Sequence, residues 1–216
     1  MKKLVVLGAG ESGVGTAILG KQKGYQVFVS DAGTIAEKYR NVLLNNSISF
    51  EEKGHTKSKI IDANLVMKSP GIPDSVSLVM ELKQKGISVI SEIEFASKYT
   101  KGIIVGITGS NGKTTTTMLV NHILKKGNLN VGMGGNIGDS FAHQVAEKNY
   151  NFHVLELSSF QLDGIVEFVP HIAIITNITP DHLDRYNYKF ENYINSKFRI
   201  TENQTEKDFL IYDDDD

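Results

Sequence analysis

The chain has 216 residues, which is long for one compact domain and suits one and a half or two. A hydrophobic content of 40% can form a sizeable core and excludes a wholly disordered protein, while 23 basic against 25 acidic residues argue against a nucleic-acid partner held by many phosphate contacts. The absence of cysteine excludes disulfides, zinc–thiolate sites, iron–sulfur clusters and thiol catalysis.

The first apolar run, residues 4–10, follows two lysines and superficially looks like a signal peptide. Glu11 and Ser12 end it at about half the usual length of the apolar part of such a peptide. It is also far shorter than the roughly 20 apolar residues of a membrane-spanning helix. We therefore expect a cytoplasmic protein with no membrane partner.

Short runs rich in β-branched residues alternate with longer amphipathic stretches through the first half of the chain. Strands are expected at residues 4–7, 27–29, 65–67 and 89–90, and helices at 34–45 and 75–85. Thr34 and Glu37 have the spacing of a capping box at the start of the first of these helices, and Gly86 would end the second. Strands alternating with helices of this length predict βαβ units and a parallel sheet.

The pattern restarts at residue 103, after a short predicted helix in 91–102 with a capping-box spacing at Ser91 and Glu94. Strands are expected at 103–107, 153–157, 172–176 and 209–212, and a helix at 114–126 that ends at Gly127. We predict an α/β protein with a Rossmann-like domain at 1–92 and a second, mostly parallel α/β domain at 93–216. Four aspartates directly follow the last expected strand, so we expect this second domain to be truncated.

Gly8, Gly10 and Gly13 form a G-x-G-x-x-G pattern between the first strand and a helix. Glycines at these places let backbone N–H groups approach a diphosphate at the helix N-terminus. Asp31 ends the second strand, where an acidic side chain would meet a ribose hydroxyl. A turn without a ligand is the alternative, and the pattern does not separate NAD, FAD and a UDP-sugar.

The stretch 106–115, Gly-Ile-Thr-Gly-Ser-Asn-Gly-Lys-Thr-Thr, is a stronger phosphate-binding signal because it joins a strand to a helix. Its N–H groups can form an anion nest, Lys113 can reach terminal phosphates and Thr114 can ligate magnesium. It departs from the strict P-loop pattern because Ile107 stands at the first glycine position. It predicts an ATP site in the second domain, and two phosphate loops in consecutive domains do not fit a simple dehydrogenase.

Three further polar residues follow strands of the second domain. Glu156 is the best candidate for a magnesium ligand, because parallel sheets place ligand sites at the C-terminal ends of their strands. His182 stands between two aspartates beyond the next strand, where a structural and a functional role are about equally supported. Lys197 lies on a helix face that it shares with apolar residues, and taken alone it is best interpreted as a surface lysine.

Four motifs, in chain order, resemble the Mur ligases. They are the phosphate loop at 106–115, Gly-Gly-Asn-Ile-Gly at 134–138, Glu-Leu-Ser-Ser-Phe-Gln at 156–161 and Thr-Pro-Asp-His-Leu-Asp-Arg-Tyr at 179–186, and Ser-Pro-Gly-Ile at 69–72 agrees with them. The resemblance covers nearly the whole chain and is closest to the branch of the family that adds D-glutamate to UDP-N-acetylmuramoyl-L-alanine. It implies an ATP-dependent amide-bond ligase of peptidoglycan precursor synthesis. In the family, the substrate carboxylate takes a phosphoryl group from ATP, and the amine of D-glutamate then displaces phosphate.

The resemblance also implies roles for individual residues. Lys113, His182 and Lys197 would be catalytic. ATP would be bound by Gly109, Ser110, Asn111, Gly112, Lys113, Thr114 and Thr115. One magnesium ion would be held by Thr114 and Glu156, and a second by His182 and Lys197. The UDP substrate would contact Glu11, Ser12, Gly13, Val14, Asp31, Ser69, Pro70, Gly71, Asn136, Ser158 and Ser159.

Two implied features need chemical comment. An ammonium cannot ligate a cation, but in the family the matching lysine is carbamylated by carbon dioxide, and we carry this over to Lys197 as a hypothesis. Desolvation on a partly apolar helix face favours the neutral amine that this reaction needs. After Asp31 the chain has Ala32 and Gly33, where relatives offer polar or basic side chains to the nucleotide.

Other functions stay open at the level of the sequence. A folylpolyglutamate-type ligase normally lacks the first domain, and a Mur ligase for another amino acid is disfavoured by the motif at 156–161. A NAD-binding oxidoreductase is supported only by the first glycine turn and Asp31. The family also carries a third domain that receives D-glutamate, and nothing after residue 212 can provide it. We therefore expect a monomer that binds the UDP substrate and catalyses little ligation alone, or a nucleotide-binding module without activity of its own.

Overall fold

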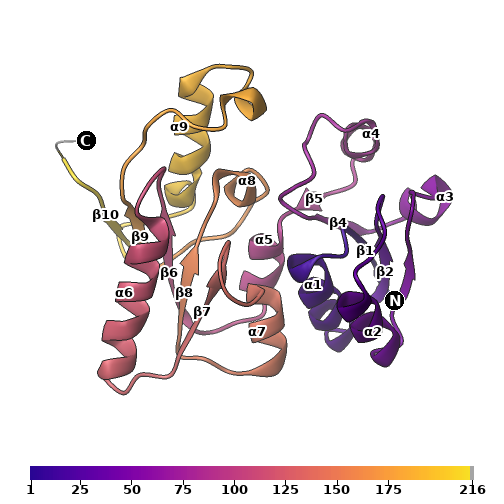
Figure 1. The fold of residues 1–216 in the computed structure, drawn as a ribbon, viewed down its shortest axis with the longest axis horizontal. Helices are drawn as coiled ribbons and strands as arrows, with labels where there is room; N and C mark the ends of the chain where they lie inside the picture. Colours follow the sequence, from indigo (N-terminus) through magenta and orange to yellow (C-terminus); the bar gives the residue numbers. More distant parts are fainter. Residues whose placement is uncertain (215–216) are drawn as a thin grey trace.

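The computed structural model describes residues 1–214, and these form two α/β lobes that lie side by side (Figure 1). The last two of the four terminal aspartates therefore lie outside the described residues. The first lobe contains, in order, β1 (Lys3–Leu7), α1 (Glu11–Gln22), β2 (Gln26–Ser30), α2 (Glu37–Asn45), β3 (Ser49–Glu51), α3 (Lys57–Ile60), β4 (Leu65–Lys68), α4 (Ser77–Gln84) and β5 (Val89–Ile90). The helix α5 (Glu92–Ser97) leads into the second lobe.

The second lobe contains the longest helix among the described residues, α6 (Lys113–Lys126). Its elements are β6 (Ile103–Thr108), α6, β7 (Val131–Gly135), α7 (Phe141–Glu147), β8 (Phe152–Glu156), α8 (Ser159–Leu162), β9 (Ile172–Ile175), η1 (Leu183–Tyr186), α9 (Phe190–Phe198), η2 (Arg199–Thr201) and β10 (Phe209–Ile211). Across residues 1–214, every helix is too short or too polar to cross a bilayer.

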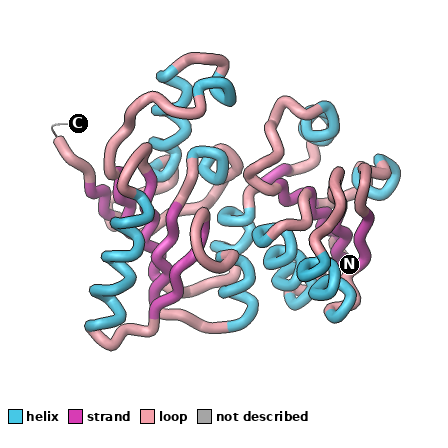
Figure 2. The backbone as a smooth tube through the Cα atoms, in the orientation of Figure 1, coloured by secondary structure: helices cyan, strands magenta, loops and turns pink. Residues whose placement is uncertain are grey.

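Each lobe has one five-stranded sheet, and all its strand pairs are parallel. Figure 2 shows the strands in magenta, gathered in two groups, one in each lobe. The strand order is β3-β2-β1-β4-β5 in the first sheet and β10-β9-β6-β8-β7 in the second. The prediction of two successive, mostly parallel α/β units is confirmed. In each sheet the strand order reverses direction at one central strand, β1 in the first sheet and β6 in the second. The crevice at the C-terminal end of such a strand is the usual ligand site of this architecture.

The central strands are buried on both faces, which explains why they read as continuous apolar runs. In β1, Leu4 and Val6 belong to a core that extends through α1 and α5 to Phe141 and Leu155 of the second lobe. The alternate residues of β1 pack against α3 and α4 on the outer face. A further cluster packs the second sheet against α6. One core is therefore shared by both lobes and fixes how the two sheets face one another.

Of the two expected capping boxes, the one at Thr34 is absent and the one at Ser91 is half formed. The helix expected from residue 34 begins at Glu37, with Ala36 as its N-cap and no side-chain cap, because Ile35 is buried and its N–H donates to Glu52 Oε2 at 3.0 Å. At α5, Ser91 accepts a hydrogen bond from the Glu94 N–H as expected, but Glu94 does not complete the capping box. Strands β3 and β7 were not expected, since β3 is only three residues long and β7 is rich in glycine.

Helix α5 ties the lobes together through two buried carboxylates. Glu94 accepts hydrogen bonds from three successive N–H groups, those of residues 166–168, at 2.8–3.0 Å, and these bonds hold its pKa below the usual value against the opposing effect of burial. Glu92 accepts from the Ser140 hydroxyl and the Ala142 N–H, yet complete burial raises its pKa. We propose a domain boundary near residue 92, because α5 begins there and follows the last strand of the first sheet along the chain.

Candidate functional site

The second glycine loop connects β6 to α6 and adopts a backbone that only glycine tolerates at two positions. Gly109 has φ +145° and Gly112, the N-cap of α6, has φ +80°. A Cβ atom at Gly109 would lie 1.9 Å from Thr176 Oγ1. The loop can therefore pass close to the segment after β9, and the first N–H groups of α6, which have no acceptor within the helix, face outward for an anion.

Residues after β9 hold this loop in place. Asn177 accepts from the Ser110 N–H through its carbonyl (2.8 Å) and from the Asn111 N–H through Oδ1 (2.9 Å), and its own amide donates to the Asn111 carbonyl (3.0 Å). The Ser110 hydroxyl donates to the Thr179 carbonyl at 2.8 Å. The loop is therefore ordered by bonds within the protein before any nucleotide arrives. We missed these anchors, although a polar Thr-Asn-Ile-Thr run directly after a buried strand is a signal that sequence reasoning can use.

Two lysines converge on the same loop. Lys113 Nζ donates to the Ser110 carbonyl at 2.8 Å, and Lys197 Nζ donates to the Gly109 carbonyl at 2.6 Å. Lys197 is buried at 1% exposure, and its ammonium lies 4.5 Å from the centre of the Tyr193 ring. Burial, assisted by the charge of Lys113, lowers the pKa of Lys197 to about 8. The sequence placed Lys197 off the polar helix face, but the simpler interpretation of a surface lysine is wrong.

Beside the loop, Thr114 and Glu156 form an oxygen pair. The Thr114 hydroxyl donates to Glu156 Oε2 at 2.7 Å, and the Asn136 side chain donates to Glu156 Oε1 at 2.8 Å. The carboxylate is buried at the C-terminal end of β8. A hydroxyl and a carboxylate at this spacing fit a magnesium ion whose other ligands are phosphate oxygens and water. Nowhere in residues 1–214 do three His, Asp or Glu side chains cluster closely enough to hold a metal by themselves.

His182 is placed apart from this pair. It lies just before η1 in a left-handed conformation (φ +49°), is exposed, and packs its ring at a tilt of 55° against the Phe160 ring, with 5.2 Å between the ring centres. Its Nε2 is 3.5 Å from an oxygen of Asp181. The structure therefore brings Thr114, Glu156 and Asn136 together and brings Lys197 to the loop, while His182 is held by an aromatic contact instead.

The first glycine turn is built from backbone and one carboxylate. Gly8 has φ +93°, and a Cβ atom at Gly13 would lie 1.9 Å from the Gly8 carbonyl oxygen, so the turn depends on glycine at both places. Asp31 accepts from the Ala9 N–H at 2.7 Å and from the Gly33 N–H at 2.8 Å. Each of its oxygens already has a backbone donor, so in this arrangement Asp31 shapes the turn.

The other predicted substrate residues fall into two groups. Near the first turn, Glu11 accepts from the Tyr39 hydroxyl (3.0 Å), Ser12 lies against Glu92, Val14 is buried, and the Ser69–Gly71 segment follows β4 with Ser69 against Gly8. In the second lobe, Ser158 caps α8 in a full capping box with Gln161, and Ser159 is buried. The two groups lie on the two lobes, where one elongated ligand can reach both.

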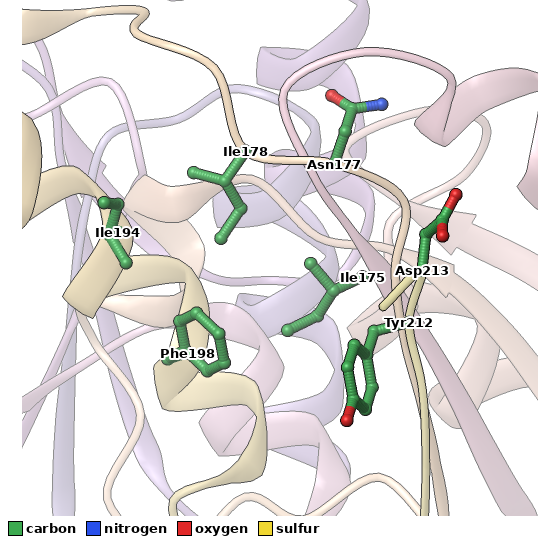
Figure 3. Close-up of a pocket in the computed structure, with 7 residues that line it drawn as sticks. All are labelled: Ile175, Asn177, Ile178, Ile194, Phe198, Tyr212 and Asp213. Atoms are coloured by element: carbon green, nitrogen blue, oxygen red, sulfur yellow. The ribbon is translucent and has the colours of Figure 1, made fainter. Parts of the chain in front are cut away.

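A cavity of about 200 Å³ lies on the other side of the residues that anchor the second glycine loop. Figure 3 shows Ile178, Ile194 and Phe198 surrounding it together with Ile175, Asn177, Tyr212 and Asp213. Its lining is mainly apolar, and Asn177 is shared with the loop anchor. A flat apolar group joined to a phosphate chain is the kind of ligand that fits such a place.

Comparison with known proteins agrees with these features. The MurD N-terminal domain matches residues 3–77, and the Mur ligase middle domain matches residues 107–216. The UDP-N-acetylmuramoylalanine–D-glutamate ligase of Christiangramia forsetii is 65% identical over 100% of this chain and 48% of its own length, and that of Bacteroides fragilis is 55% identical over 100% and 49%. The chain thus spans about half the length of these curated relatives.

Solved structures show the same fold at low sequence identity. The UDP-N-acetylmuramate-alanine ligase MurC of Thermotoga maritima has a TM-score of 0.61 and 22% identity over 98% of this chain and 49% of its own. The UDP-N-acetylmuramate:L-alanyl-gamma-D-glutamyl-meso-diaminopimelate ligase of Neisseria meningitides has a TM-score of 0.65 and 18% identity over 100% and 72%.

Proposed function

The chain belongs to the Mur ligase family, and from that premise we propose that it carries the nucleotide-binding parts of a cytoplasmic ligase that joins D-glutamate to UDP-N-acetylmuramoyl-L-alanine with ATP. The observation that carries this proposal is the second glycine loop, where Lys113, Lys197 and the Thr114–Glu156 pair meet at one helix N-terminus. The two relatives from Christiangramia forsetii and Bacteroides fragilis described above are UDP-N-acetylmuramoylalanine–D-glutamate ligases.

The first half of the reaction brings two anions together. The carboxylate of the L-alanyl group attacks the γ-phosphorus of ATP, the bond to ADP breaks, and an acyl phosphate results. Lys113 would move from the Ser110 carbonyl to the terminal phosphates and offset the repulsion, and the α6 N-terminus would bind the phosphate chain. A magnesium ion held by Thr114 and Glu156 would neutralise further phosphate charge.

Lys197 would act through its amine. With a pKa of about 8, about one tenth of the amine is neutral at pH 7, far more than for an ordinary lysine, and burial shields it from water. Carbamylation would join this nitrogen to the carbon of carbon dioxide and release one proton, leaving a carboxylate-like group beside the loop. This hypothesis is open to mass spectrometry of the chain held in 13C-bicarbonate, where the unmodified residue alone would contradict it.

In the second half, the amine of D-glutamate attacks the acyl carbon and phosphate leaves. His182 lies at the end of the segment that anchors the loop, and with Lys197 it would hold a second magnesium ion, which would supply further positive charge. The UDP-muramoyl substrate would span both lobes. Its nucleotide would lie at the first glycine turn, and its muramoyl group near Asn136, Ser158 and Ser159.

Calorimetry on one preparation of the 216-residue chain tests this proposal. UDP-N-acetylmuramoyl-L-alanine should bind with a stoichiometry of one, and NAD should not bind. Tight NAD binding without UDP-sugar binding would instead favour the oxidoreductase alternative. ATP with magnesium should bind the parent chain and lose affinity in Lys113→Ala.

A further inference from the structure

Arg185 presents a guanidinium group that has no salt-bridge partner within residues 1–214. The residue lies in η1 and is half-buried, and its guanidinium carbon is 4.3 Å from the centre of the Phe160 ring. Within residues 1–214, no carboxylate or carbonyl pairs with it, so the ring is its partner. A guanidinium packed against an aromatic ring still has N–H donors free for other partners and loses little freedom when it binds an oxyanion.

This guanidinium faces a cavity of about 330 Å³ between the lobes. The cavity is lined from the first lobe by Lys68, Pro73, Asp74 and Ser75, and from the second by Phe160, Asp163, Asp184, Arg185 and Asn187. In Figure 1 these segments are the loop between β4 and α4 and the region around α8, on the two sides of the junction. A ligand in this cavity would therefore touch both lobes at once.

The acidic residues of the lining are largely committed elsewhere. Asp74 pairs with Lys68 at 3.2 Å and with Lys83 at 2.7 Å. Asp163 accepts hydrogen bonds from the hydroxyls of Tyr186 and Ser196 at 2.9 and 2.6 Å. Asp184 is exposed, and water screens its charge. Among the described lining residues, Arg185 is thus the cation most available to a ligand.

The two cations of the cavity, Lys68 and Arg185, are close enough to repel one another. Its ammonium donates to the Ile72 carbonyl at 2.6 Å and so fixes the Ser69–Gly71 segment. Burial lowers the pKa of Lys68, Asp74 opposes this effect, and the positive charge of Arg185 adds to the lowering. An anion between Lys68 and Arg185 would relieve that repulsion.

The first glycine turn has no cation among its own residues. Its own side chains, Glu11 and Asp31, are acidic, and Ala32 and Gly33 offer no positive charge. The turn adjoins the cavity wall, because the Ser69 N–H donates to the Leu7 carbonyl at 2.9 Å and Ser69 lies against Gly8. A phosphate bound by the backbone of this turn therefore lies next to the segment that Lys68 positions.

We propose that Arg185, presented by the ring of Phe160, binds a phosphate group of the nucleotide-sugar substrate across the junction between the lobes. The inference rests on the proposed function, since it assigns a contact to that substrate. It makes the second lobe contribute the positive charge that the first glycine turn lacks. Substrate bound at the first turn is then also held by the lobe that carries the ATP site.

A purely structural role for Arg185 gives a different expectation. If the guanidinium only packs the turn against Phe160, its removal lowers stability and leaves the affinities for ligands with and without phosphate equally changed. A phosphate contact instead lowers the affinity for UDP-sugars and pyrophosphate and leaves uridine unaffected. The two roles are separated by the ligand series.

The experiment is calorimetry with the 216-residue chain and four ligands: UDP-N-acetylmuramoyl-L-alanine, UDP, uridine and inorganic pyrophosphate. Arg185→Gln should bind the first two about 10- to 50-fold more weakly than the parent chain, with an unchanged thermal midpoint and unchanged uridine binding. Lys189→Gln, which removes an exposed positive charge four residues away, should bind like the parent. Phe160→Leu should lose part of the affinity, and adding Arg185→Gln to it should cost less than Arg185→Gln alone costs.

The outcomes separate this inference from the proposed function. If the parent chain binds the UDP-muramoyl ligand and Arg185→Gln binds it equally well, the contact is wrong and the proposed function stands. If the parent chain does not bind that ligand but binds pyrophosphate through Arg185, the anion site stands and the proposed substrate is wrong. If neither ligand binds the parent chain, both proposals are overturned.

Discussion

The two glycine loops of this protein share a backbone design and differ in the charge around it. Gly8 at φ +93° and Gly109 at φ +145° each follow a buried parallel strand and lead into a helix. Carboxylates flank the first turn, whereas Lys113 and Lys197 both bond to carbonyls of the second. The difference shows that the strand–turn–helix unit supplies N–H groups for any phosphate. The side chains next to the turn determine whether the negative charge of the phosphate is neutralised there.

The loops also differ in how they are held. The first is shaped by the single carboxylate of Asp31, with one backbone donor on each oxygen. The second is held by several bonds from the segment after β9, including three from Asn177. We expect the second loop to tolerate less change in its backbone and the first to depend more on groups from elsewhere.

The largest effect is expected from a methyl group added to the second loop. Gly109→Ala places a Cβ atom 1.9 Å from Thr176 Oγ1 at a φ of +145°, so strain and overpacking should lower the free energy of unfolding by about 4 kcal/mol. Gly8→Ala meets side-chain atoms, Ser69 Oγ at 2.6 Å and Ser69 Cβ at 2.9 Å, and should cost less, because Gly109→Ala has a closer clash and also meets the Asn177 backbone at 3.1 Å. Gly10→Ala has nothing within 4 Å and serves as the control. Urea unfolding that ranks Gly109→Ala with the control would remove the distinction between the loops.

A second large effect concerns acid and the sheet that carries the second loop. His153 is fully buried in β8, three residues before Glu156, and desolvation lowers its pKa to about 4. Between pH 6.5, the pKa of an unfolded histidine, and pH 4, this residue binds a proton in the unfolded chain but not in the folded one. The free energy of unfolding should therefore fall by about 3 kcal/mol as the pH decreases through this range.

The control for acid sensitivity is a pair of glutamine variants. His153→Gln should lose less stability than the parent between pH 7 and pH 4.5 in urea unfolding, since glutamine does not titrate and can still reach the Thr100 hydroxyl that His153 Nε2 contacts at 2.9 Å. His55→Gln, at a half-buried histidine of the first lobe, is the control for the substitution itself. Equal acid dependence in all three proteins would place the acid-sensitive group elsewhere.

Most strands and helices of this molecule can be predicted from its sequence, because the hydrophobic periods of strands and helices are local patterns. The runs that became β1, β2, β4, β6, β8 and β9 are buried on both faces, and a continuous β-branched run records that burial directly. The start of α2 was wrong because a tertiary contact, the burial of Ile35, overrode a capping spacing. β7 was missed because its glycines carry no β propensity, and its place between β8 and the Asn136 loop is set by pairing.

The candidate site was readable only where its chemistry lies within one loop. Lys113 and Thr114 follow from a phosphate-loop pattern, and the Thr114–Glu156 pair follows from the rule that parallel strands end at one edge. The burial of Lys197, the anchoring by Asn177 and the Phe160–Arg185 contact join segments tens of residues apart. No period or spacing encodes such contacts, so only the folded structure reveals them.

A third prediction tests the local charge of the second loop. Lys113→Ala should weaken binding of ATP with magnesium by about 100-fold, because the phosphate chain loses its flexible counter-charge at the α6 N-terminus. Lys125→Ala, near the other end of the same helix, should bind ATP like the parent. Calorimetry of both variants decides whether the contrast in charge between the loops matters for binding. Similar losses in the two variants would point to a general field effect instead.

The smallest effect concerns the carboxylate that shapes the first turn. In Asp31→Asn one oxygen remains to accept a hydrogen bond, and the amide group opposes an N–H donor from either Ala9 or Gly33. The turn should become less ordered, with about 1 kcal/mol less stability and about 5-fold weaker UDP binding, while ATP binding stays unchanged. Glu37→Gln, an exposed change of the same charge in α2, controls for the altered net charge. If Asp31 instead contacts a ribose hydroxyl, Asp31→Asn should weaken uridine binding without any loss of stability, and the backbone of the first turn would then need another explanation for its order.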